Sequence, residues 1–74
     1  MSQYDKDVIF FVTWLLNKVA DAYGKTAAET YRLLQSAHIV DDYLMPSYDV
    51  LHTMGELALI EDVQTVAAKR GVVL

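Results

Sequence analysis

One stretch, residues 5–23, constrains the fold more than any other part of the chain. Its apolar residues recur at intervals of three and four, the spacing that places side chains on one face of an α-helix. That face comprises Val8, Phe11, Val12, Leu15, Leu16, Val19, Ala22 and Tyr23. A helix with so broad an apolar face must be covered by other elements. The stretch is therefore predicted to be the main helix of an all-α domain.

Two large aromatic residues of this stretch lie outside the broad face. Phe10 and Trp14 are one helical turn apart and point to the side that carries Asp21. Either residues 39–45 or 72–74 of the same chain cover them, or they form a patch for a partner. Aromatic residues are enriched at the centres of protein interfaces. We expect Phe10 and Trp14 to be partner-binding, in the specific form of a twofold homodimer packed through the first helix.

Helix ends are marked by short signals that divide the rest of the chain. Gly24 ends the first helix, and Thr26 with Glu29 has the spacing of a capping box that begins a second. Pro46 suits the first turn of a short third helix. The predicted fold is all-α, one domain over residues 1–74, a small bundle of three to four helices at about 5–23, 27–37, 47–52 and 54–70.

The second and fourth helices carry further expectations. Tyr31 and Leu34 are expected to form the buried stripe of the second helix, and His38 to follow its end in the left-handed conformation. Thr53 and Glu56 repeat the capping-box spacing, which predicts a sharp corner at residues 52–53 and a fourth helix starting there.

The composition narrows the class of protein. The chain has no cysteine, so it can form neither disulfides nor thiolate metal sites, and 54% of its residues are hydrophobic. Its apolar runs are too short to cross a bilayer, and nothing in it resembles a secretory signal. We expect a cytoplasmic protein that binds no membrane.

Charge is distributed unevenly along the chain, whose formal net charge is −4. Residues 34–67 contain no Lys or Arg. The same stretch contains Asp41, Asp42, Asp49, Glu56, Glu61 and Asp62. An acidic stretch of this kind repels phosphates, so no nucleic-acid binding is expected. The stretch is expected either to form a solvated acidic surface or to bind a basic partner.

The densest polar cluster, residues 47–53, contains Tyr48, Asp49, His52 and Thr53. On a helix Asp49 could orient the His52 imidazole for catalysis. The structural alternative places Asp49 near a helix N-terminus, His52 in a corner hydrogen bond and Thr53 as a cap. We expect the structural roles: no enzyme, no catalytic residue, no metal site and no cofactor.

The same cluster carries a resemblance. Tyr48-Asp49-Val50-Leu51-His52-Thr53-Met54-Gly55, with Pro46 before it and Glu61-Asp62-Val63 after it, resembles a family of short bacterial proteins of unknown function (DUF3791).

The resemblance implies no established activity. Members of the family it resembles are often encoded beside a companion family that looks like ADP-ribosyltransferase-type toxins. This association implies an antitoxin-like or partner-binding role. The expected function is a protein–protein interaction module that binds itself or a companion protein. The alternative is a small helix-turn-helix-type transcriptional regulator.

Overall fold

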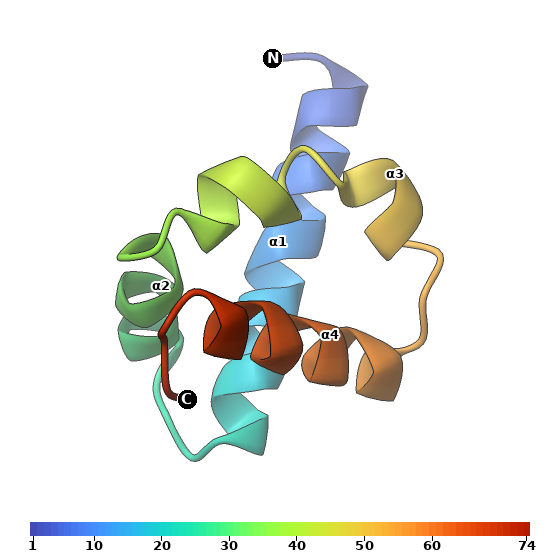
Figure 1. Ribbon diagram of the computed structural model, residues 1–74. Coiled ribbons are helices and arrows are strands. Elements are labelled where there is room, and N and C mark those ends of the chain that lie inside the picture. Colours follow the sequence, from blue (N-terminus) through green and yellow to red (C-terminus); the bar gives the residue numbers. More distant parts are fainter.

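The computed structural model describes residues 1–74 and is built from helices alone (Figure 1). In chain order these are α1 (Gln3–Ala22), α2 (Ala27–Gln35), η1 (Val40–Leu44), α3 (Tyr48–Leu51) and α4 (Glu56–Lys69). The predicted all-α fold is confirmed. The element η1 is a single π-helical turn, in which the Met45 amide donates to the Val40 carbonyl at 3.0 Å. No helix is both long enough and apolar enough to span a bilayer.

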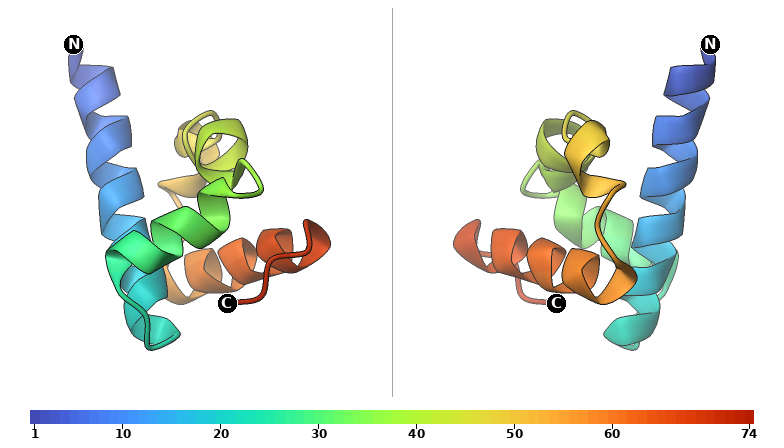
Figure 2. Two further views of the ribbon diagram at one scale, coloured as in Figure 1. Left: turned by 90° about the vertical axis from the view of Figure 1, so that its left-hand side faces the viewer. Right: turned by 90° about the vertical axis from the view of Figure 1, so that its right-hand side faces the viewer.

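The longest helix, α1, is flanked by different elements along its length. Its C-terminal half packs against α2 and α4, while η1 and α3 lie beside its N-terminal half (Figure 2). A capping box at Ser2 begins α1 earlier than expected: the Asp5 amide donates to Ser2 Oγ, and the Ser2 amide donates to the Asp5 carboxylate. The helix ends in a Schellman turn at Gly24, whose φ is +65°.

The core confirms most of the predicted apolar face of α1. Val8, Val12, Leu15 and Val19 are buried, as are residues of every other element. The latter are Leu34, Ile39, Val40, Leu44, Leu51, Leu59, Val63 and Ala67. The expectation for Ala22 was wrong: it is exposed, and Ala20 is buried instead. Ala20 lies one residue after Val19 and one turn before Gly24, where the Lys25 amide closes the helix end by donating to the Ala20 carbonyl at 2.9 Å.

The stripe of α2 is narrower than expected. Leu34 is buried, but Tyr31 is 46% exposed, and Thr30 takes the second buried position. The stripe is centred on residues 30 and 34, one turn apart, so Tyr31 lies at its edge. The Thr30 hydroxyl satisfies its hydrogen-bonding need by donating to the Thr26 carbonyl at 2.9 Å. His38 has a φ of +58°, which confirms the left-handed residue predicted after this helix.

The corner before α4 differs from the prediction. The predicted capping box of Thr53 and Glu56 does not form, because the Thr53 hydroxyl donates to the Val50 carbonyl at 2.7 Å. The helix begins two residues later, with Gly55 at its N-cap in extended backbone and no side-chain cap. Thr53 therefore closes α3, whereas the Thr26–Glu29 capping box of α2 forms as predicted.

This difference predicts unequal effects of two threonine substitutions. Thr26→Ala removes an N-cap acceptor and should lower the free energy of unfolding by about 1 kcal/mol. Thr53→Ala removes an exposed bond to a turn carbonyl and should cost less than half of that. Urea denaturation followed by circular dichroism measures both. An equal loss in the two variants would contradict the assignment of the caps.

A polar contact joins η1 to α4 beside the core. The hydroxyl of half-buried Tyr43 donates to the Asp62 carboxylate. Burial, reinforced by this hydrogen bond, raises the pKa of Tyr43 to about 12. Deprotonation would place two negative charges in contact, so the bond supports the fold only while Tyr43 is neutral.

The raised pKa gives stability a specific alkaline dependence. Tyr43 ionises near pH 10 in the unfolded chain and near 12 in the folded one, so its contribution is complete below pH 10 and is lost as the pH rises towards 12. The free energy of unfolding should fall between pH 9 and pH 11.5 more steeply in the parent than in Tyr43→Phe. Tyr31→Phe, at an exposed position, should keep the parent slope. Parallel slopes for the parent and Tyr43→Phe would contradict the role of this bond.

Candidate functional site

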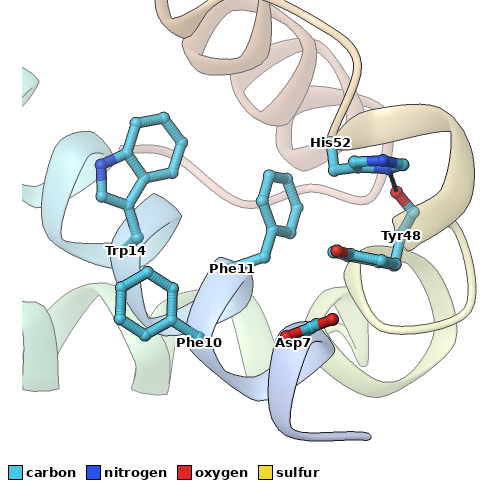
Figure 3. Close-up of a pocket in the computed structure, with 6 residues that line it drawn as sticks. All are labelled: Asp7, Phe10, Phe11, Trp14, Tyr48 and His52. Atoms are coloured by element: carbon cyan, nitrogen blue, oxygen red, sulfur yellow. Dashed lines mark hydrogen bonds between the residues drawn. The ribbon is translucent and has the colours of Figure 1, made fainter. Parts of the chain in front are cut away.

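A groove lies between α1 and α3, and it joins the two features that the sequence presented separately. It has a volume of about 290 Å³ and is lined by six residues. They are Asp7, Phe10, Phe11, Trp14, Tyr48 and His52. Phe11 lies between Trp14 on one side and the Tyr48–His52 pair on the other, with Phe10 and Asp7 below them in the view of Figure 3. We call this site the aromatic groove.

The helix α1 supplies one wall of the aromatic groove through its regular spacing. Asp7, Phe10, Phe11 and Trp14 stand at positions i, i+3, i+4 and i+7, so they share one face of the helix, which borders the core. Phe10 is 76% exposed, while Phe11 and Trp14 are half-buried against the core. Neither segment considered as a cover lies over Phe10. Residues 72–74 instead lie against Tyr23, which follows α1, and Ala68 of α4.

The helix α3 supplies the other wall through Tyr48. The ring of Tyr48 stacks on His52 at a centroid distance of 4.5 Å and meets Phe11 edge-on at 5.5 Å. A second edge contact, with Tyr4, has a centroid distance of 5.6 Å. His52 Nδ1 lies 2.8 Å from the Tyr48 carbonyl oxygen, which fixes the imidazole at the end of α3 (Figure 3). Tyr48 thus holds α3 to α1 and fixes the width of the groove.

The motif at residues 48–53 is divided between the groove and its surroundings. Tyr48 and His52 line the groove, whereas Thr53 closes α3. Asp49 accepts a hydrogen bond from the Tyr4 hydroxyl at 3.1 Å, and this bond to a carboxylate raises the pKa of Tyr4. Asp49 and His52 are each engaged elsewhere, so the pairing that a catalytic role would need is not formed.

The aromatic groove contains a single carboxylate. Asp7 is the only acidic residue in the lining, which contains no Lys or Arg. Asp7 Oδ1 accepts a hydrogen bond from Gln3 Nε2 at 2.8 Å. No three His, Asp or Glu side chains of the structure come together as a metal site would require. The groove therefore presents aromatic surface with one negative charge at its edge.

Sequence reasoning did not single out two of the six lining residues. Phe11 was assigned to the apolar face of α1, where it borders both the core and the groove, and Asp7 had no assigned role. The signal was present in the helical spacing, because Asp7 lies one turn before Phe10 and two turns before Trp14. The contribution of Tyr48 and His52 had no such signal, since they meet α1 only in the folded chain.

Fold and site together define a small all-α protein with an open aromatic groove between its first helix and a short third helix. The chain belongs to the family described as Protein of unknown function (DUF3791), whose model matches residues 10–70. The resemblance inferred from the sequence is thereby confirmed. The match includes five of the six groove residues, all but Asp7. Comparisons with curated proteins and with solved structures gave no match.

The two walls should respond differently to truncation. Tyr48→Ala removes ring contacts with Phe11, Tyr4 and His52 and should lower the free energy of unfolding by about 2 kcal/mol. Phe10→Ala changes a side chain that is 76% exposed, so its effect should stay within about 0.5 kcal/mol. Urea denaturation measures both variants. A loss at Phe10 as large as that at Tyr48 would show that Phe10 is part of the core.

Proposed function

We propose that this protein is a protein–protein interaction module whose contact surface is the aromatic groove. The observation that carries the proposal is the exposure of Phe10, at 76%, beside half-buried Trp14 in a groove rather than as an isolated surface residue. Exposing aromatic surface to water costs free energy, and this free energy is regained when a partner covers the surface. Aromatic side chains in such positions are typical anchors of interfaces.

The size of the groove suits the centre of an interface rather than the whole of it. A stable interface buries about 800 Å² on each partner, and one covered aromatic side chain accounts for about 150–250 Å². Phe10 and Trp14 would therefore be the anchors of a larger contact. The partner is either a second copy packed through α1 or a companion protein, the latter in the antitoxin-like role that the family resemblance implies.

Two observations favour association over the other classes considered. A DNA-reading helix needs side chains for base edges, but α3 has four residues and contains no Lys, Arg, Asn or Gln. A hydrolase of the Ser, Thr or Cys type needs a presented hydroxyl or thiol nucleophile, but the groove lining contains no Ser, Thr or Cys. Neither class draws support from the exposed aromatic wall, which association explains directly.

Light scattering after gel filtration tests the proposal with one disruptive variant and one matched control. The chain is run alone and with the product of the neighbouring gene. Phe10→Glu should abolish the dimer or the complex that the parent forms while leaving the helical circular dichroism unchanged. Val73→Glu, at a position that is 87% exposed on the C-terminal segment, should retain it. Trp14→Glu should also abolish association, although its half-buried ring makes it the less clean variant.

Two results would contradict the proposal. One is a parent that stays monomeric both alone and with the companion. The other is an assembly that survives Phe10→Glu, because the contact surface would then lie elsewhere. A dimer of the parent alone identifies the partner as a second copy, and a complex formed only in the mixture identifies it as the companion.

A further inference from the structure

We infer that the aromatic groove takes an arginine side chain of a different protein, with the guanidinium against the aromatic rings and paired with Asp7. The inference rests on the proposed function and names the chemistry of the partner. Two properties of the groove carry it: the charge of its lining and the kind of apolar surface that it offers.

The charge of the lining favours a cation. Asp7 is the only carboxylate in the groove lining, which contains no Lys or Arg. Gln3 donates to Asp7 Oδ1, which leaves Oδ2 to accept from a ligand. The chain as a whole has the same sign, since its net charge is −4 and residues 34–67 contain no Lys or Arg. A positively charged partner would be attracted at long range and held at Asp7.

The apolar surface of the groove is aromatic rather than aliphatic. Phe10, Phe11, Trp14 and Tyr48 line it, and the rings of Phe11 and Trp14 lie 6.1 Å apart at an interplanar angle of 31°. Aromatic faces attract cations, and tryptophan does so most strongly. A guanidinium is planar, stacks on rings and donates several hydrogen bonds to a carboxylate, so arginine fits this combination better than lysine.

The chain itself does not supply this arginine to a second copy. A twofold dimer through α1 would present α1 residues to the groove, and α1 contains no arginine. Arg70 is engaged within its own chain, where Nη1 donates to the Ala37 carbonyl at 3.0 Å and lies 4.0 Å from Asp42. Arg32 is on α2, which lies on the left of Figure 1, across α1 from α3 on the right. The occupant is therefore a basic segment of another protein.

Tryptophan fluorescence tests the inference, because Trp14 is the only tryptophan and lies in the groove. The probes are a capped oligoarginine peptide, an oligolysine peptide and an oligocitrulline peptide of equal length. Citrulline has the shape of arginine without its charge. The arginine peptide should change the Trp14 emission saturably, with an apparent Kd about tenfold lower than that of the citrulline peptide. The lysine peptide should lie between them.

Two acidic-to-amide variants distinguish binding in the groove from a general electrostatic attraction between the acidic chain and the basic peptide. Asp7→Asn keeps the Oδ1 acceptor for Gln3 but removes the charge, so it should raise the Kd for the arginine peptide by about threefold to fivefold. Glu61→Gln removes an exposed charge on α4, outside the groove, and should leave the Kd within the error of the measurement.

Three results would overturn the inference. If the citrulline peptide bound as tightly as the arginine peptide, the positive charge would not contribute to binding. Equal effects of Glu61→Gln and Asp7→Asn would show that the attraction is diffuse. An unchanged Trp14 emission with every peptide would show that the groove takes no such side chain. None of these results removes an assembly that depends on Phe10, so failure here is distinguishable from failure of the proposed function.

Discussion

The packing of the aliphatic face of α1 against α2 and α4 is the interaction on which the rest of the structure depends. The chain has no cysteine for a disulfide and no cluster of three His, Asp or Glu side chains, and a chain of this length buries only about 60% of its unfolded surface. Leu15 at 0% exposure and Val19 at 1% lie where the C-terminal half of α1 meets α2 and α4. Each fully buried leucine contributes about 2 kcal/mol. The short elements η1 and α3 lie beside the N-terminal half of the same helix (Figure 2).

One helix thus serves two purposes through two of its faces. The face with Val8, Val12, Leu15 and Val19 holds the domain together, and the face with Asp7, Phe10 and Trp14 borders the groove. Phe11 separates them and touches both. Tyr48 links the faces to the third helix through ring contacts of 5.5 Å and 5.6 Å, so the groove keeps its shape without Phe10 being buried. This division explains how a chain with so small a core can leave a phenylalanine exposed.

Local signals predicted what local physics determines. The aliphatic stripe of α1, the capping box at Thr26 and the left-handed His38 all follow from interactions within a few residues, and all three are confirmed. The capping box at Thr53 failed because its spacing is necessary but not sufficient: the Val50 carbonyl competes for the same hydroxyl. Tyr31 failed because the burial of a residue at the edge of a stripe depends on where the neighbouring helix lies.

The sequence indicated the residues on each side of the aromatic groove separately, but not that they meet. Phe10 and Trp14 could be recognised as unpartnered from the helical wheel, and Tyr48 and His52 as part of a distinctive motif. No periodicity relates positions separated by more than thirty residues, so their meeting depends on tertiary structure. The structure also separates members of the motif that adjoin in sequence, directing Asp49 to Tyr4 and Thr53 to Val50.

The central claim, that the aromatic groove is the surface by which this protein meets its partner, is tested most directly by amide and indole NMR. Spectra of the isotope-labelled chain are recorded as its concentration rises and then as the companion protein is added. The account predicts shift changes concentrated in residues 7–14 of α1 and residues 48–52 at α3, including the Trp14 indole N–H and the His52 amide. Changes centred on α2 or α4, or no changes under either condition, would contradict it.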